Sequence, residues 1–265
     1  MKGKVAVITG GNGTLGTTFT KGLAERGARV YVLGRDAEKS QMLKEALKSQ
    51  HLEIHTLTCD VLDQQAVETA VQAVLKQAQR VDILINAAGG NHPRATIKPD
   101  QAFADVSLEA FKQVTDLNLL GTVIPSMAFS KPMIAQGTGC IINISSMAAQ
   151  LPLTRVVGYS ASKAAVDNFT RWLAVEFASK YGEGIRVNAI APGFFIADQN
   201  RKLLVNDDGS LTPRGETILN QTPAKRFGKP EELLSTLLWL CDDRSSFVNG
   251  VIIPVDGGFS AFSGV

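Results

Sequence analysis

Two side chains suited to proton transfer lie four residues apart in Tyr159-Ser160-Ala161-Ser162-Lys163, thirteen positions after Ser146. Residues at i and i+4 lie on the same face of a helix. An ammonium group beside a phenol favours the phenolate and lowers the phenol pKa from its usual value of about 10. Tyrosine can then exchange a proton with a hydroxyl or carbonyl oxygen near neutral pH. The spacing therefore predicts general acid–base chemistry at Tyr159.

A glycine-rich segment, Thr9-Gly10-Gly11-Asn12-Gly13-Thr14-Leu15-Gly16, contains the pattern G-x-G-x-x-G. It follows a short apolar run and opens a stretch of helical period. In that position glycines let the backbone approach a pyrophosphate, whose charge lies at the helix N-terminus. A tight turn without a ligand is the alternative. The residues predicted to contact a dinucleotide here are Gly10, Asn12, Gly13, Thr14, Leu15 and Gly16.

Short β-branched runs alternate with longer stretches of helical period along the chain. The expected strands are 4–9, 29–33, 54–58, 81–86, 140–145, 185–190 and 251–255. The expected helices are 14–26, 36–50, 63–79, 107–136 with interruptions at Pro125 and Pro132, 158–181 and 231–242. The strands are continuous apolar runs, as burial on both faces of a parallel sheet requires. We predict one α/β domain over residues 1–265, a Rossmann-like doubly wound parallel sheet of about seven strands flanked by helices.

Two long segments, near residues 89–106 and 194–227, follow the carboxyl ends of expected strands. Both are expected to be irregular. Ligands of open α/β sheets bind at these strand ends, and long loops there are commonly functional. The two segments are therefore predicted to line the substrate side.

The composition excludes several kinds of partner. The 265 residues carry a formal net charge of +2, and no run of five or six like charges occurs, so neither a nucleic acid nor a membrane is expected as a partner. The three cysteines are isolated, which favours reduced thiols and a cytoplasmic protein. The three histidines form no metal-ligand pattern, so no metal is expected.

Taken together, these motifs resemble the short-chain dehydrogenase/reductase family over nearly the whole chain. The matching residues are Thr9, Gly10, Gly16, Asp60, Val61, Asn86, Ala87, Ala88, Gly89, Asn118, Ser146, Tyr159, Lys163, Asn188, Pro192 and Gly193. The resemblance implies that Tyr159 is the general acid/base and that Lys163 lowers its pKa and holds the nicotinamide ribose. It also implies that Ser146 binds the substrate oxygen and that Asn118 supports a proton-relay water.

The resemblance also implies cofactor contacts outside the glycine-rich turn, at Asp60, Val61, Asn86, Ala87, Ala88, Gly89, Pro192 and Gly193. Asp60 would lie near adenine, or else cap a helix. Asn86 would tie its strand to the following loop, and Asn118 could instead be a buried amide without a relay water. The family pattern TGxxxGxG has glycine where this chain has Thr14, a departure for which Gly13 can compensate.

The identity of the nicotinamide cofactor depends on the end of the second strand. NAD enzymes of this fold place an acid there for the ribose 2′-OH. This chain has Gly34 followed by Arg35, which favours NADP(H) because a guanidinium can bind a 2′-phosphate; NAD(H) stays open. Asp36 is interpreted as the N-cap of the next helix.

Polar residues on the substrate side suggest a small anionic substrate. Arg155 lies between Ser146 and Tyr159, and His92 and Arg94 lie in the first long segment. The second long segment contributes Gln199, Asn200 and Arg201. An arginine can bind a carboxylate, whereas an exposed surface charge is the alternative. Such donors suit a sugar acid better than a steroid or a long acyl chain.

The segments 86–93, 111–122, 191–195 and 255–265 resemble one branch of the family, the D-mannonate oxidoreductases or fructuronate reductases, close to the gluconate 5-dehydrogenases. The implied reaction interconverts D-fructuronate and D-mannonate. A 3-oxoacyl-carrier-protein reductase and a polyol dehydrogenase are alternatives. A dinucleotide-sensing module without catalysis would usually lack the Tyr–Lys pair. The family also implies a homotetramer formed through the helices near 107–136 and 158–181.

Overall fold

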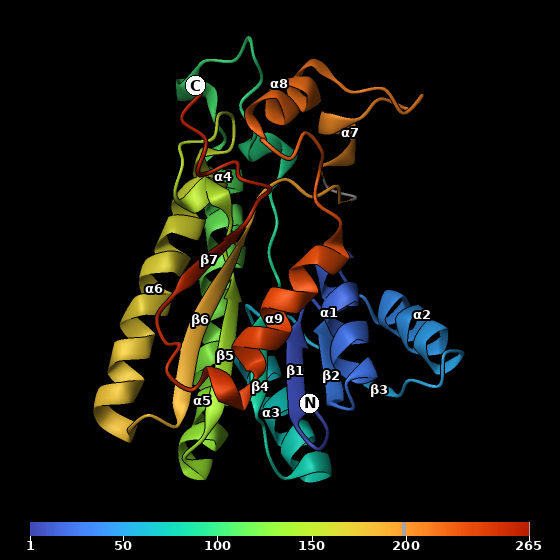
Figure 1. Cartoon of the computed structure of the whole chain (residues 1–265), viewed down its shortest axis with the longest axis vertical. Helices are drawn as coiled ribbons and strands as arrows, with labels where there is room; N and C mark the ends of the chain where they lie inside the picture. Colours follow the sequence, from blue (N-terminus) through green and yellow to red (C-terminus); the bar gives the residue numbers. More distant parts are fainter. Residues whose placement is uncertain (198–199, 265) are drawn as a thin grey trace.

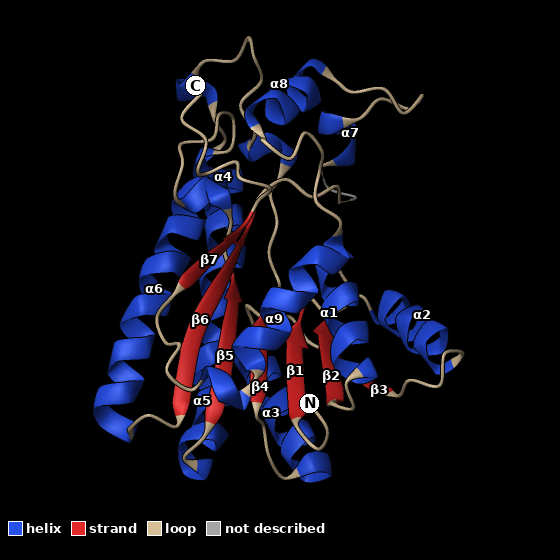
Figure 2. Ribbon diagram, in the orientation of Figure 1, coloured by secondary structure: helices blue, strands red, loops and turns tan. Residues whose placement is uncertain are grey.

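The computed structural model describes residues 1–197 and 200–264. Its strands form one seven-stranded sheet in the order β3-β2-β1-β4-β5-β6-β7, with every neighbouring pair parallel. The strands are β1 (Val5–Thr9), β2 (Arg29–Gly34), β3 (Ile54–Thr58), β4 (Ile83–Asn86), β5 (Gly139–Ile144), β6 (Ile185–Pro192) and β7 (Ile252–Val255). From β1 the chain builds the sheet outward to β3 on one side and, after crossing back to β4, outward to β7 on the other, as in a doubly wound fold (Figure 2). The predicted fold class is confirmed.

Helices cover both faces of this sheet (Figure 1). One face packs against α1 (Thr14–Glu25), α2 (Ala37–Lys48) and α9 (Leu234–Cys241). The other packs against α3 (Gln64–Ala78), α5 (Gly121–Gln136) and α6 (Val157–Tyr181). The central strands β1, β4, β5 and β6 are buried along their whole length, which explains their uninterrupted apolar sequences.

The expected interruption at Pro125 and Pro132 is wrong. Both prolines lie inside α5, whose side chains Phe129 and Met133 are fully buried against the sheet. This burial offsets the hydrogen bonds that proline removes from a helix. The helical region is instead interrupted earlier, where α4 (Leu108–Thr115) passes into a π-helical turn, Asp116–Leu120, centred on Asn118.

The prediction that the segment 194–227 is irregular is partly wrong. The segment contains α7 (Arg201–Leu204) and α8 (Pro213–Gln221). Thr212 caps α8 by accepting a hydrogen bond from the amide of Gly215, and Pro213 occupies its first turn. The segment 89–106 holds two short 3₁₀ turns, Pro93–Ala95 and Phe103–Asp105. Helices α7 and α8 lie beyond the carboxyl ends of the strands, where they form an upper part of the molecule (Figure 1).

The glycine-rich turn between β1 and α1 is closely packed. A Cβ atom on Gly16 would lie 2.0 Å from the carbonyl oxygen of Gly10, and Gly10 itself has φ +63°. Helix α1 begins at Thr14 after Gly13, and no side chain caps it. Its first amide groups are therefore available to a ligand. None of the described helices is long and apolar enough to cross a membrane.

Candidate active site

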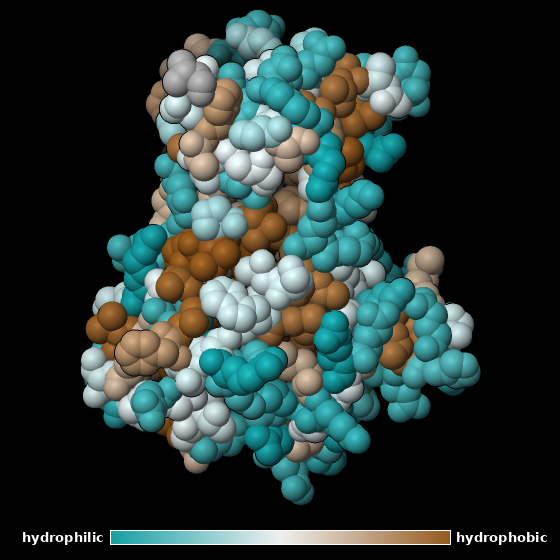
Figure 3. Space-filling view, in the orientation of Figure 1, coloured by the Kyte–Doolittle hydropathy of each residue, from teal (hydrophilic) through white to brown (hydrophobic). Residues whose placement is uncertain are grey.

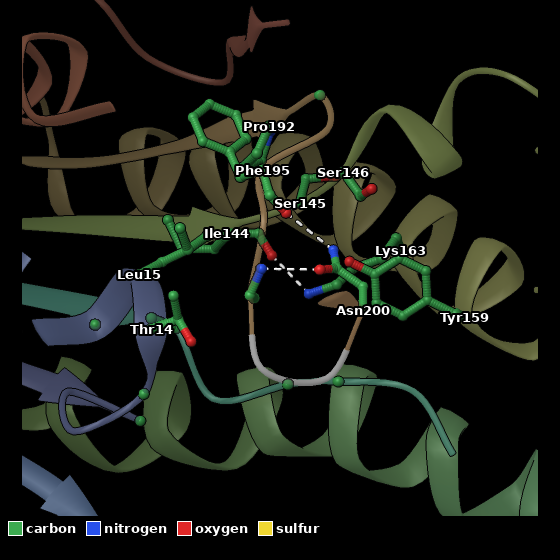
Figure 4. Close-up of a pocket in the computed structure, with 18 of the residues that line it drawn as sticks. Thr14, Leu15, Ile144, Ser145, Ser146, Tyr159, Lys163, Pro192, Phe195 and Asn200 are labelled. Atoms are coloured by element: carbon green, nitrogen blue, oxygen red, sulfur yellow. Dashed lines mark hydrogen bonds between the residues drawn. The ribbon is translucent and has the colours of Figure 1, made fainter. Parts of the chain in front are cut away.

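A cavity of about 310 Å³ lies over the carboxyl ends of the strands, between the start of α1 and the start of α6 (Figure 4). The predicted residues that line it are Gly10, Gly13, Thr14, Leu15, Gly16, Ala87, Gly89, Ser146, Tyr159, Lys163, Pro192, Gly193 and Asn200. The uncapped N-terminus of α1 opens into this cavity, so its amide groups can bind an anion such as a pyrophosphate. The residues present therefore fit a dinucleotide.

Several predicted cofactor residues lie outside the lining of this cavity: Asn12, Arg35, Asp60, Val61, Asn86 and Ala88. Asn86 is buried and donates to Ser126 of α5 and Asn143 of β5, so it ties its strand to these elements and not, as predicted, to the following loop. Asp60 accepts a hydrogen bond from the amide of Leu62, whereas α3 is capped by Asp63.

The end of β2 carries no acid of the kind that binds a ribose 2′-OH, and a side chain at Gly34 would require Asn12 to move. The side-chain amide of Asn12 donates to Ser40, at 2.9 Å, and covers Gly34, whose added Cβ would lie 2.6 Å from it. Arg35 follows as an exposed residue, and Asp36 caps α2 as predicted. Lys39, which sequence reasoning missed, lines the cavity from the first turn of α2. Its signal was only its position one turn after Arg35.

Tyr159 and Lys163 lie side by side on α6 (Figure 4). The Lys163 Nζ atom lies 5.7 Å from the centre of the Tyr159 ring and donates to the carbonyl oxygen of Ile144 at 2.7 Å. Burial lowers the pKa of Lys163 to about 8, and the Asp167 carboxylate opposes this shift. The pKa of Tyr159 is raised, not lowered as the spacing predicts, because burial disfavours the phenolate; the hydroxyl of Ser146 opposes that shift by hydrogen bonding.

Two serines at the end of β5 face different partners. Ser146 Oγ accepts a hydrogen bond from the amide of Ala148 at 3.1 Å and lines the cavity. Ser145 Oγ donates to the Asp167 carboxylate, which is 4% exposed. Asp167 thus lies behind Lys163, one turn further along α6. The only local signal for Asp167 is that it is an acidic residue four positions after the lysine.

Asn118 is fully buried in the π-helical turn, and its side chain is occupied by protein groups. Nδ2 donates to the carbonyl oxygens of Gly90 and Val114, both at 2.7 Å, and Oδ1 accepts from the amide of Gly90 at 3.1 Å. These bonds fix the segment after β4 beside the cavity. A Cβ atom on Gly89 would lie 2.7 Å from Asn118 Oδ1 and 3.4 Å from Lys163 Nζ.

A second cavity, of about 450 Å³, shares Ser146, Tyr159, Gly193 and Asn200 with the first and extends beneath α7 and α8. Its lining includes the predicted residues Arg155 and His92. It also includes three cationic residues that sequence reasoning missed, Lys98, Lys202 and Arg214. No aspartate or glutamate is among its described lining residues. No local sequence pattern marks Arg214 as a site residue, because only the tertiary fold brings α8 to this cavity.

The predicted placement of Arg94 and Arg201 in the substrate site is wrong. Arg201 is exposed and lines neither cavity. Arg94 is exposed and outside the second cavity, and its guanidinium pairs with Glu109 at 3.4 Å. Asn200 lines both cavities, but its amide closes the turn at the start of α7, donating to Phe195 and accepting from Ala197. Gln199 lies outside the described residues.

Titration of Lys163 tests the electrostatics of this site. Without cofactor, we expect its ammonium to lose a proton near pH 8. Replacing Asp167 with Asn removes the negative charge that favours the ammonium, so the pKa of Lys163 should fall below that of the wild type. Side-chain NMR shifts of ¹³C-labelled lysine, assigned with a Lys163→Arg variant, measure both values.

Glu176→Gln is the matched control, because this carboxylate lies on the same helix but pairs with Lys180. It should leave the titration of Lys163 unchanged. Equal titration curves for Asp167→Asn and the wild type would contradict the role given to Asp167.

Comparison with known proteins places this geometry in a family. The family model for short chain dehydrogenases matches residues 4–207. The chain is 46% identical to the uncharacterized oxidoreductase UxuB of Bacillus subtilis (strain 168), covering 100% of this chain and 98% of that protein. It is 31% identical to the gluconate 5-dehydrogenase of Gluconobacter oxydans (strain 621H), over 98% and 96% of the two chains.

Among solved structures, a candidate D-mannonate oxidoreductase from Haemophilus influenzae, with bound NAD, superposes with a TM-score of 0.93 at 41% identity over 100% of this chain and 98% of that one. A gluconate 5-dehydrogenase from Burkholderia cenocepacia J2315, in complex with NADP and tartrate, superposes with a TM-score of 0.87 at 30% identity over 98% and 96%. This chain belongs to the short-chain dehydrogenase/reductase family and is an NAD(P)-dependent oxidoreductase that acts on CH–OH groups.

Proposed function

We propose that the enzyme interconverts a secondary alcohol and a ketone on a sugar acid of the D-mannonate/D-fructuronate type. One observation carries this proposal: the cavity that opens onto Ser146 and Tyr159 is lined by two arginines and two lysines, and by no carboxylate among the described residues. Such a lining favours an anion over a neutral polyol. Its volume, about 450 Å³, lies within the usual range of small-molecule sites.

In the proposed mechanism, Tyr159 exchanges a proton with the substrate oxygen and Ser146 donates a hydrogen bond to that oxygen. Lys163 stabilises the phenolate and binds the ribose of the nicotinamide cofactor, which supplies or accepts the hydride when bound. The residues proposed to surround the cofactor are Gly10, Asn12, Gly13, Thr14, Leu15, Gly16, Asp60, Val61, Asn86, Ala87, Ala88, Gly89, Pro192 and Gly193. Asn118 stays the proposed support of a relay water, although its side-chain amide donates to Gly90 and Val114 and its carbonyl oxygen accepts from the Thr122 hydroxyl.

Relatives support the same substrate class. One structural relative is described as a candidate D-mannonate oxidoreductase, and another binds tartrate, a hydroxy acid. His92 and Asn200 line the cavity with the cations and would contact the substrate hydroxyls. A 3-oxoacyl-carrier-protein reductase also occurs among the relatives, at 30% identity, as does a D-threitol dehydrogenase at 32%. These two activities are the outcomes against which the proposal is tested.

A substrate panel tests the proposed activity. D-Mannonate, D-gluconate and 5-keto-D-gluconate should give a higher kcat/KM than neutral polyols or a 3-oxoacyl thioester. Tyr159→Phe should lower kcat by about 10²- to 10⁴-fold, because the general acid/base is lost, without weakening cofactor binding. Tyr181→Phe, an exposed tyrosine at the end of the same helix, is the control and should retain full activity. A preference for neutral polyols or for the thioester would overturn the sugar-acid proposal.

We propose NADP(H) as the preferred cofactor, with NAD(H) as a weaker alternative. The support is the neutral end of β2, covered by Asn12, together with Arg35 and the cavity-lining Lys39. Arg35→Ala and Lys39→Ala should each lower kcat/KM for NADP⁺ about tenfold and leave the value for NAD⁺ nearly unchanged. Lys48→Ala, at the far end of α2, serves as the control. A strong NAD⁺ preference that survives Arg35→Ala would refute the 2′-phosphate contact.

We propose a cytoplasmic homotetramer. All three cysteines are free and buried, as in a reducing compartment. Exposed apolar side chains gather on the outer sides of α5 and α6, where Met127, Trp172 and Val175 are 57–67% exposed. A second apolar area lies over the edge strand β7 and α9 (Figure 3), near the exposed Trp239 and Phe247. Two separate surfaces are what a tetramer with dihedral symmetry requires.

Light scattering after size exclusion should therefore give the mass of four chains. Trp172→Glu should produce a smaller species, because it places a charge in an apolar interface. Met42→Glu, an equally exposed methionine on α2, should leave the mass unchanged. A wild-type monomer would contradict the proposal.

A further inference from the structure

Arg155 and Arg214 reach the second cavity from separate parts of the chain. Arg155 lies in the segment before α6, and Arg214 lies in the first turn of α8. Both side chains are partly buried. Burial lowers the pKa of Arg214, and the positive charge of Arg155 lowers it further. Both residues line the same cavity, and Arg214 donates to Thr154, the residue before Arg155, so the two positive charges lie near each other.

Neither arginine has a carboxylate partner among the described residues. Elsewhere the guanidinium groups of Arg80, Arg94, Arg226 and Arg244 pair with Asp82, Glu109, Glu232 and Asp242. Two like charges held together at reduced solvent exposure are unfavourable unless an anion lies between them. The arrangement therefore indicates an anionic ligand rather than a structural ion pair.

The backbone and the neighbouring residues hold both groups in place. Arg155 adopts φ +75°, a left-handed conformation that is unfavourable for a non-glycine residue. Its Nε donates to the carbonyl oxygen of Ile97 at 2.9 Å, and its own carbonyl oxygen accepts from the Ile97 amide. This leaves the two terminal nitrogens for a ligand. Arg214 donates to the hydroxyl and carbonyl oxygens of Thr154, at 3.2 and 3.3 Å, next to Arg155 in the chain.

We propose that Arg155 and Arg214 bind the substrate carboxylate together, as one two-arginine subsite. The inference rests on the proposed function and deepens it, because it assigns the recognition of the acid group to named atoms. A carboxylate has about four lone-pair positions and can accept from two guanidinium groups at once. Because Arg214 of α8 already donates to Thr154, the two guanidinium groups are held next to each other before a substrate carboxylate binds.

The test compares a sugar acid with a neutral polyol in matched variants. Arg155→Ala and Arg214→Ala should each lower kcat/KM for D-mannonate about 10- to 100-fold, mainly through KM, because a charge-assisted contact is lost. Activity on a neutral polyol should change less than threefold. The double variant should lose less than the product of the two single effects, because both arginines act on one group.

Arg201→Ala is the control, since Arg201 lies in the same segment but is exposed and outside the cavity lining. Arg214→Lys keeps the charge without the paired donors and should fall between the wild type and Arg214→Ala. A thermal melt of each variant verifies that it is folded. Equal loss for the acid and the polyol would overturn the two-arginine subsite.

Calorimetric titration of the cofactor-bound enzyme with D-gluconate separates this inference from the proposed function. Turnover of sugar acids by the wild type, with Arg214→Ala unchanged, would overturn the subsite and leave the proposed function standing. D-Gluconate binding that is lost in Arg214→Ala, without turnover of any sugar acid, would support the subsite and overturn the proposed function. No binding by the wild type would overturn both.

Discussion

A buried ammonium group constrains the centre of this enzyme. Lys163 is 4% exposed, and a buried charge costs several kcal/mol unless it has partners. The partners here are the carbonyl oxygen at the end of β5 and the carboxylate of Asp167, one helical turn away. Ser145 holds that carboxylate from the same strand end. The lysine is therefore stable only when α6 is docked against β5, which is also the arrangement that places Tyr159 beside Ser146.

The same region depends on a local departure from α-helical geometry. The π-helical turn Asp116–Leu120 carries the Asn118 amide to both backbone groups of Gly90. The chain after β4 is thereby fixed close to Lys163, where even a methyl group on Gly89 would be crowded. The Tyr159 ring packs on Ala95, from the same loop, and on two residues of α4. The loop, the π-helical turn and α6 therefore position the proton-transferring groups together.

The features that the sequence predicted correctly are encoded over short distances. Tyr159 and Lys163 are one helical turn apart, and the glycine-rich turn is a continuous segment between a strand and a helix. The seven short runs of mainly apolar residues were enough to predict the seven strands of the sheet. The incorrect predictions concern features that depend on tertiary contacts or on local caps. Burial against the sheet keeps α5 continuous through Pro125 and Pro132. A capping threonine followed by a proline starts α8 within a segment that is otherwise polar. Arg214 meets Thr154 across 60 positions of sequence, so no local pattern could place it in the site.

The positions of the charged residues are more informative about function than the net charge of the chain. A net charge of +2 over 265 residues is nearly neutral and by itself identifies no ligand. The fold separates the arginines into two groups. Arg94 was predicted to contact the substrate but pairs with Glu109. Arg155 and Arg214, in contrast, line a cavity whose described lining contains no carboxylate. In the proposed subsite, the substrate carboxylate balances two guanidinium groups that have no carboxylate partner among the described residues, one of them on a strained backbone.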